Sequence, residues 1–189
     1  MTRHPPTLVN VEGDWIVDPK ASPRAILPGA FNPVHAGHWG LAEAASRMLD
    51  LPVEFELSLR NVDKPEITEE ETRRRVVQFH GRAPVWLTHA PRFADKAELF
   101  PGATFVVGAD TAARIVDPAD YADDSATMNV VLARIRERRC RFLVAARVLR
   151  RRLLLLNDLP IPAEFSDIFV ELPGFRLDLS STELRLGDR

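Results

Sequence analysis

The sequence has little of what marks secreted, membrane-spanning or general nucleic-acid-binding proteins. Cys140 is the one cysteine among 189 residues, which excludes an internal disulfide and fits a reducing compartment. No apolar run approaches the roughly 20 residues of a membrane-spanning helix, and the stretch Met1–Pro6 lacks the apolar core of a signal peptide. The 25 basic and 27 acidic residues leave a net charge of −2, whereas general polyanion binding needs a large positive excess. We therefore expect a soluble, cytoplasmic protein without a membrane or nucleic-acid partner.

The composition is that of a globular chain with one main domain. Apolar residues make up 46% of the chain and charged residues 28%, and the length suffices to bury a core. Residues 1–24 are predicted to be an N-terminal extension, in which Leu8–Val11 and Trp15–Val17 form a hairpin around a turn at Gly13. This hairpin is expected to cover a sheet edge of the domain formed by residues 25–189.

From residue 25 onward, strand patterns alternate with helical patterns. Strands are predicted at Ala25–Leu27, Val53–Leu59, Pro84–Leu87, Thr104–Val107 and Arg141–Ala146, with short extended pieces at Ile168–Val170 and Arg176–Leu179. Helices are predicted at Gly37–Asp50, Thr68–His80, Phe93–Leu99, Ala112–Val116, Thr127–Arg139 and Ser180–Leu186. Such alternation indicates an α/β fold, with a parallel sheet and helices on both faces. Ligands of these sheets bind beyond the carboxyl ends of the strands.

The turn after the first of these strands has the residue types of an anion site. Gly29 and Ala30 are small enough for a ligand to approach the backbone closely. His35 and His38 are three residues apart at the start of a helix, so both imidazoles should lie on one face of it. Unpaired N–H groups and a partial positive charge at the helix start favour a polyphosphate there. A metal site is the alternative reading, but no third ligand is evident, and we predict no protein-bound metal.

A second phosphate cradle is predicted near the end of the chain. In Leu179–Arg185, Ser180 and Glu183 have the spacing of a capping box at a helix start. Hydroxyl groups, free backbone N–H groups and Arg185 would together suit a phosphate. A plain helix cap beside a solvated arginine is the other interpretation of this segment.

These segments resemble the signatures of the nucleotidyltransferase superfamily with the HxGH motif. Gly29–His38 is most similar to the first signature of the nicotinate- and nicotinamide-mononucleotide adenylyltransferases, although Asn32 stands where many bacterial members carry Asp. Leu179–Arg185 resembles the second signature, Ile-Ser-Ser-Thr-x-Ile-Arg, and Gly108–Asp110 resembles the family's Gly-x-Asp stretch. The resemblance implies a Rossmann-like fold. It also implies transfer of a nucleotide from ATP or CTP to a phosphorylated small molecule, with release of pyrophosphate.

The resemblance also implies roles for individual residues. His35 and His38 would contact the triphosphate and stabilise the transition state, with Arg185 and Lys64 as further catalytic cations. Lys64 would face the acceptor phosphate or the leaving pyrophosphate, although a solvated loop lysine is the alternative. The remaining predicted contacts are to the nucleotide: Gly29, Ala30, Phe31, Gly108, Asp110, Ser180, Ser181 and Thr182. Among these, Asp110 would accept from a ribose hydroxyl, or else merely cap a helix.

The predicted activity is adenylyl transfer from ATP to an acceptor such as nicotinate or nicotinamide mononucleotide. Mg²⁺ is expected to arrive with the nucleoside triphosphate. The alternatives are a cytidylyltransferase acting on a phospho-alcohol and a non-catalytic nucleotide-binding domain. The sequence also allows a homo-oligomer.

The segment Arg134–Arg152 holds nine arginines. We interpret them as solvated faces of a helix and a strand, because apolar residues separate them.

Overall fold

A computed structural model describes residues 4–60, 65–121, 127–149 and 152–177. Its strands are β1 (Thr7–Val9), β2 (Trp15–Val17), β3 (Ala25–Pro28), β4 (Glu54–Ser58), β5 (Val85–Thr88), β6 (Thr104–Gly108), β7 (Arg141–Leu149), β8 (Arg152–Leu154) and β9 (Phe169–Leu177). Its α-helices are α1 (Ala36–Leu49), α2 (Glu69–Val76), α3 (Phe93–Leu99), α4 (Ala109–Ile115) and α5 (Met128–Glu137). Short 3-10 helices are η1 (Val77–Phe79), η2 (Pro118–Tyr121), η3 (Leu156–Asp158) and η4 (Ala163–Ile168). None of the described helices is long and apolar enough to span a membrane.

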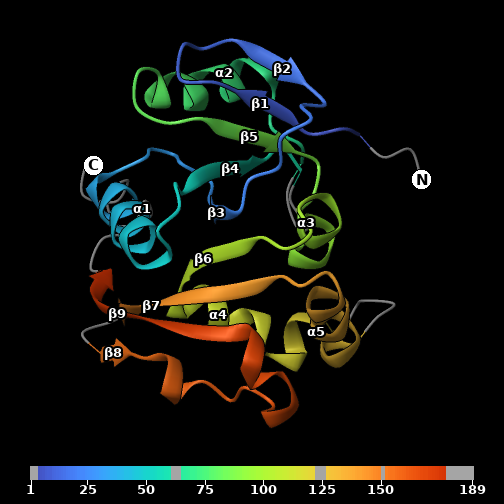
Figure 1. Cartoon of the computed structure of the whole chain (residues 1–189), viewed down its shortest axis with the longest axis vertical. Helices are drawn as coiled ribbons and strands as arrows, with labels where there is room; N and C mark the ends of the chain where they lie inside the picture. The colour runs from blue at the N-terminus through green and yellow to red at the C-terminus, as the bar shows by residue number, and fades with distance from the viewer. Residues whose placement is uncertain (1–3, 61–64, 122–126, 150–151, 178–189) are drawn as a thin grey trace.

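The strands form a single, mostly parallel sheet, as the alternating pattern predicts. Its order is β2-β1-β5-β4-β3-β6-β7-β8, and β9 pairs with β7 off this path (Figure 1). Pairings among β3, β4, β5, β6, β7 and β9 are parallel, whereas β1–β2, β1–β5 and β7–β8 are antiparallel. The chain moves outward from β3 through β4 to β5 and then returns to place β6 against the other side of β3. This reversal is the topological switch point, beside which ligands of open α/β sheets bind.

Helices cover both faces of the sheet and enclose two apolar layers. One layer packs α1 and α2 against the side chains of alternate strand residues, such as Leu27, Phe55 and Val106. The other packs α3, α4 and α5 against the opposite side chains, such as Ile26 and Phe105. The period-2 alternation in the strands produces this division, because neighbouring side chains of a strand point to opposite faces.

The N-terminal hairpin adds two strands to the sheet. β1 pairs with β5 from Thr7 opposite Leu87 to Val9 opposite Val85, so it covers that edge as predicted. β2 then forms the outermost strand of this end (Figure 1), and its residues Trp15, Ile16 and Val17 are all exposed.

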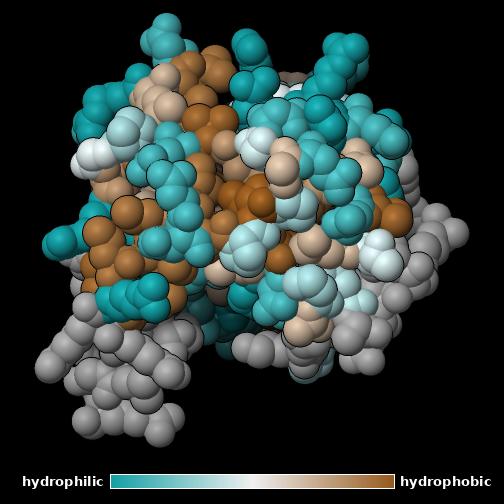
Figure 2. Space-filling model, turned by 90° about the horizontal axis from the view of Figure 1, so that it is seen from below, coloured by the Kyte–Doolittle hydropathy of each residue, from teal (hydrophilic) through white to brown (hydrophobic). Residues whose placement is uncertain are grey.

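The other end of the sheet is more extended than the sequence patterns indicate. β7 continues to Leu149, and β9 runs unbroken from Phe169 to Leu177 where two short pieces were predicted. β9 bulges between Leu172 and Arg176, opposite Ala145 and Ala146 of β7, and Gly174 within this bulge has a positive φ. Figure 2, which views the molecule from below, shows hydrophobic residues interspersed with hydrophilic ones on its surface.

Candidate active site

The loop between β3 and α1 lies at the switch point of the sheet. β3 is paired with β4 on one side and β6 on the other, so the residues that follow Pro28 emerge between two parallel neighbours. His35 is the N-cap residue of α1 and His38 lies in its first turn. Both imidazoles are therefore at the positive end of a helix and at the carboxyl edge of the sheet, where the sequence predicts the phosphate site.

The two imidazoles lie against each other, with 3.8 Å between their ring centroids and 33° between their planes. The backbone N–H of His35 donates to Nδ1 of His38 at 3.2 Å. Because Nδ1 accepts this bond, the neutral His38 ring carries its proton on Nε2, which can donate to a ligand. Both ring nitrogens of His35 are buried and have no hydrogen-bond partner within the described residues. Buried polar atoms normally have partners, so this pair of nitrogens is suited to a polar ligand.

Both histidines favour the neutral form. Burial, with smaller contributions from the neighbouring His35 and Arg147, lowers the pKa of His38 to about 3. Burial, with a smaller contribution from Arg147, also lowers the pKa of His35. A bound polyanion would act in the opposite direction because a nearby negative charge favours the imidazolium form.

Arg147 is the functional candidate that sequence reasoning missed. It lies near the carboxyl end of β7 and is only 6% exposed, so the interpretation of Arg134–Arg152 as solvated faces is wrong for this residue. Its Nε lies 3.7 Å from Oδ2 of Asp110, in the first turn of α4. The signal was present in the strand alternation, because Leu143, Ala145 and Arg147 share one face. Arg147 is thus a charged residue in an apolar stripe.

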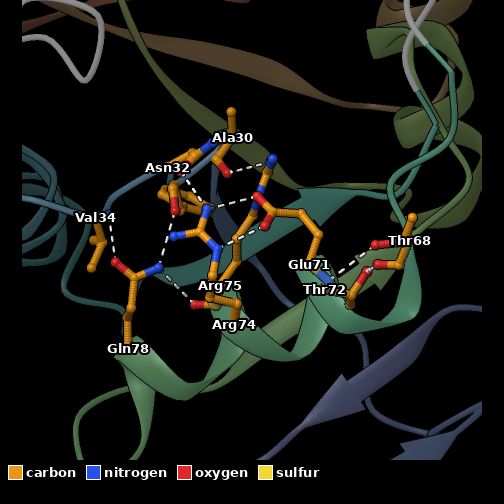
Figure 3. A network of polar contacts seen from close by, with 10 residues as sticks. Ala30, Asn32, Val34, Thr68, Glu71, Thr72, Arg74, Arg75 and Gln78 are labelled. Carbon is orange, nitrogen blue, oxygen red and sulfur yellow. Dashed lines mark hydrogen bonds and ion pairs between the residues drawn. The ribbon is translucent and has the colours of Figure 1, made fainter. Parts of the chain in front are cut away.

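Helix α2 and the 3-10 helix η1 that follows it anchor the β3–α1 loop through a set of long-range polar contacts (Figure 3). Arg75 donates to the Ala30 carbonyl at 3.0 Å and Arg74 donates to Oδ1 of Asn32 at 2.6 Å. Gln78 donates to the Phe31 carbonyl at 3.1 Å and accepts from the Val34 N–H at 3.0 Å. The loop therefore has a defined conformation before any ligand binds, which lowers the entropic cost of binding.

Ion pairs within helix α2 hold Arg74 and Arg75 in place. Glu71 accepts from Arg74 and from Arg75, each at 2.7 Å, and these bonds lower the pKa of Glu71 to about 2. Thr68 caps the helix by accepting from the Glu71 N–H at 3.2 Å (Figure 3). This N-cap begins the helix that supports the site loop at Thr68, where the sequence predicts a helix start.

Gly29 and Phe31 have a packing role in addition to the predicted nucleotide contact. The Phe31 side chain is fully buried, contacts the rings of His38, Phe55 and Phe79, and has a φ of 46°. A Cβ on Gly29 would lie 2.6 Å from the Phe31 ring, so this position requires glycine whether or not a ligand is bound. The Phe31 side chain is therefore part of the core beneath the loop and not a surface for the nucleotide.

The structure brings part of the predicted site together. Gly108 ends β6 and caps α4, next to the β3 edge, and Asp110 follows it. Five predicted residues lie outside the described residues: Lys64, Ser180, Ser181, Thr182 and Arg185. β9 is parallel to β7 and its last residue, Leu177, is in register with Arg147. The chain therefore leaves the described region at the carboxyl edge that carries the histidines.

Because the histidines are buried in the neutral form, we expect the free energy of unfolding to fall in mild acid. Between pH 6.5 and about 3 the unfolded chain binds a proton at His38 that the folded chain does not bind. Stability is then fully present above pH 6.5 and is lost as the pH falls towards 3, at up to about 1.4 kcal/mol per pH unit. We expect His38→Asn to reduce this slope in urea unfolding between pH 5 and 6.5, with His4→Asn as the exposed control. Equal slopes in wild type and His38→Asn would contradict the prediction.

The described residues contain no group of three or more His, Cys, Asp or Glu side chains that could hold a metal ion. The model of the family described as cytidylyltransferase-like matches residues 26–187 of the chain. The search of curated proteins found no match to the chain.

Proposed function

Because the chain belongs to the cytidylyltransferase-like family of nucleotidyltransferases, we propose that it transfers AMP from ATP to a phosphorylated small molecule. The proposed acceptors are nicotinate and nicotinamide mononucleotide, and pyrophosphate is the second product. The observation that carries this proposal is the histidine pair at the start of α1. Its two imidazoles contact each other at the switch point, and the His35 nitrogens have no partner within the described residues.

The proposed role of these groups is to bind the triphosphate. Nε2–H of His38, the first backbone N–H groups of α1 and the guanidinium of Arg147 are donors or positive charges at one edge of the sheet. Helix N-termini favour phosphate for this reason. Asp110 would accept from the ribose, and its position beside Arg147 is consistent with a nucleotide that lies over β6 and β7.

The transfer needs no protein nucleophile. The acceptor phosphate has a second pKa of about 6, so it is largely a dianion at neutral pH. One of its oxygens attacks the α-phosphorus of ATP, and the bond from that phosphorus to the bridging oxygen of pyrophosphate breaks. The chain's contribution is to position the two phosphates in line and to stabilise the charge that develops on the leaving group.

The residues outside the described region complete this proposal. Ser180 follows Leu177 by three residues, which span at most about 10 Å. Because Leu177 is in register with Arg147, a role for Ser180, Ser181, Thr182 and Arg185 at the triphosphate is compatible with the topology. Lys64 would serve the acceptor phosphate or the pyrophosphate. Mg²⁺ would enter as part of the metal–triphosphate substrate.

A cytidylyltransferase is the second candidate, favoured by the description of the matching family. The chemistry at the phosphates is the same, so the base and the acceptor distinguish the two. The test is magnesium-dependent pyrophosphate release over a matrix of ATP, CTP, GTP and UTP against phosphorylated acceptors. The acceptors include both pyridine mononucleotides and phospho-alcohols. Release with ATP and a pyridine mononucleotide supports the first candidate, release with CTP and a phospho-alcohol supports the second, and release with no pair would overturn both.

Arg147→Met is expected to weaken ATP binding by about tenfold or more, since hydrogen bonds to charged groups contribute about 1.5–3 kcal/mol. Isothermal titration of ATP without acceptor measures this directly. Arg114→Met is the matched control, because Arg114 on α4 is highly exposed and pairs with Asp120. Arg147→Lys should recover part of the loss. Unchanged ATP affinity in Arg147→Met would remove Arg147 from the site.

A further inference from the structure

A cavity separate from the histidine site lies between the N-terminal hairpin and α2. Its volume is about 180 Å³, and it is partly open to solvent. Its floor is apolar and includes Val9, Val76, Phe79 and Val85. Its rim includes Trp15 and Arg73. A mostly apolar lining with a few polar groups is typical of pockets for small molecules, and the volume limits the ligand to one or two rings.

The hairpin is a fixed wall of this cavity. β1 is paired with β5, and the N–H of Gly81 donates to the Val11 carbonyl at 2.9 Å. At the hairpin turn, the position of a Cβ on Gly13 is 3.1 Å from Nδ1 of His80. The turn therefore lies directly against the end of η1. These contacts hold the hairpin wall of the cavity in place.

The lining favours a planar anion. The indole of Trp15 is 44% exposed, and the Arg73 guanidinium lies 5.7 Å from its ring centroid. An aromatic ring can pack on the indole and the apolar floor, while an anionic substituent meets the guanidinium. Among the described residues, none of those that line the cavity is acidic. Arg73 also pairs with Glu69, but both side chains are largely exposed, and such pairs contribute little that a ligand would have to replace.

Helix α2 connects this cavity to the active-site loop. Arg73 and Val76 line the cavity, whereas Arg74 and Arg75 of the same helix bind Asn32 and Ala30. We propose that the cavity between the hairpin and α2 is a second ligand site, for a planar aromatic anion, and that α2 transmits its occupancy to the β3–α1 loop. This site is distinct from the proposed catalytic pocket and does not depend on its activity.

The test uses 2-naphthoate as the probe and its neutral isostere 2-naphthamide as the control ligand, both added to the full chain. Titration followed by ¹H–¹⁵N spectra should show 2-naphthoate shifting the amides of Gly13, Trp15 and Val77. It should also shift those of Ala30 and Val34 in the loop. We expect 2-naphthamide to bind about tenfold more weakly because it lacks the charged contact. Equal affinity for the two probes, or shifts that map elsewhere, would overturn the site.

Matched variants separate a specific site from non-specific binding. Arg73→Met should remove the preference for the carboxylate, whereas Arg47→Met should keep it, because Arg47 forms an equally exposed i,i+4 pair with Glu43. Val77→Trp should block the cavity, since Val77 lines it and is 67% exposed, and Val130→Trp on α5 should not. A preference that survives Arg73→Met would refute the role of the guanidinium. Binding that leaves the loop amides unmoved would refute the coupling through α2. Because binding is measured without catalysis, these results stand apart from any failure of the proposed function.

Discussion

His38→Ala is expected to reduce nucleotidyl transfer by about 10²-fold or more, the typical cost of losing one preorganised donor to a developing negative charge. The reason is geometric. Nδ1 of His38 already accepts from the His35 backbone, so the Nε2–H is the group left to donate to the phosphates. Steady-state pyrophosphate release with the best substrate pair measures the effect.

A second substitution distinguishes this donor from a packing role. In His38→Asn, the side-chain oxygen can still accept from the His35 N–H while the Nε2 donor is lost. Both variants should therefore lose activity, but Asn should keep more of the α1 start intact, as judged by the unfolding midpoint at pH 7.5. His4→Ala, which changes an exposed histidine, is the activity control. Full turnover in His38→Asn would exclude His38 as a transition-state donor.

Lys96→Met is expected to destabilise the protein by about 3–5 kcal/mol, the cost of leaving one partner of a buried ion pair alone. Nζ of Lys96 donates to both carboxylate oxygens of Glu56 at 2.7 Å and to the Ala90 carbonyl at 2.8 Å. Thr88 donates to the same carboxylate, and Glu56 is fully buried. Urea unfolding at pH 7 gives the free energy directly.

Two controls accompany this prediction. Arg47→Met breaks an exposed pair and should change stability by about 0.5 kcal/mol or less. The double variant Glu56→Leu/Lys96→Met removes both charges and should be more stable than Lys96→Met alone, because no buried charge is left without a partner. If the double variant is less stable than Lys96→Met, the pair is not the source of the destabilisation.

This ion pair shows where sequence reasoning stopped. Lys96 lies in a short helix and Glu56 in an alternating strand, and neither pattern indicates that the two side chains meet. The pairing depends on the β4–β5 register, which aligns Glu56 with Trp86, and on how α3 packs across that face. Register and helix packing arise from contacts between residues far apart in the chain, so local patterns cannot supply them.

At the histidine site, too, the sequence indicated some features and the tertiary structure supplied the others. The sequence alone placed His35 and His38 after a strand and at the start of a helix, as the structure has them. The neutral form of the rings, their close contact, the fixed loop and the position of Arg147 depend on packing by other elements. The structure also gives Gly29 a role that the sequence did not indicate, because the absence of a side chain there makes room for the Phe31 ring.

The sequence alone determined the alternation of strands and helices, the hairpin at the edge and the residue types at the turn after β3. These are local properties, because strand and helix periodicity and helix starts depend on near neighbours in the chain. Only the tertiary structure decided that Arg147 is near enough to lower the pKa of both histidines, that α2 holds their loop and that the hairpin and α2 line a cavity. Those features depend on which distant side chains share one face of the sheet, and that is settled by packing between elements.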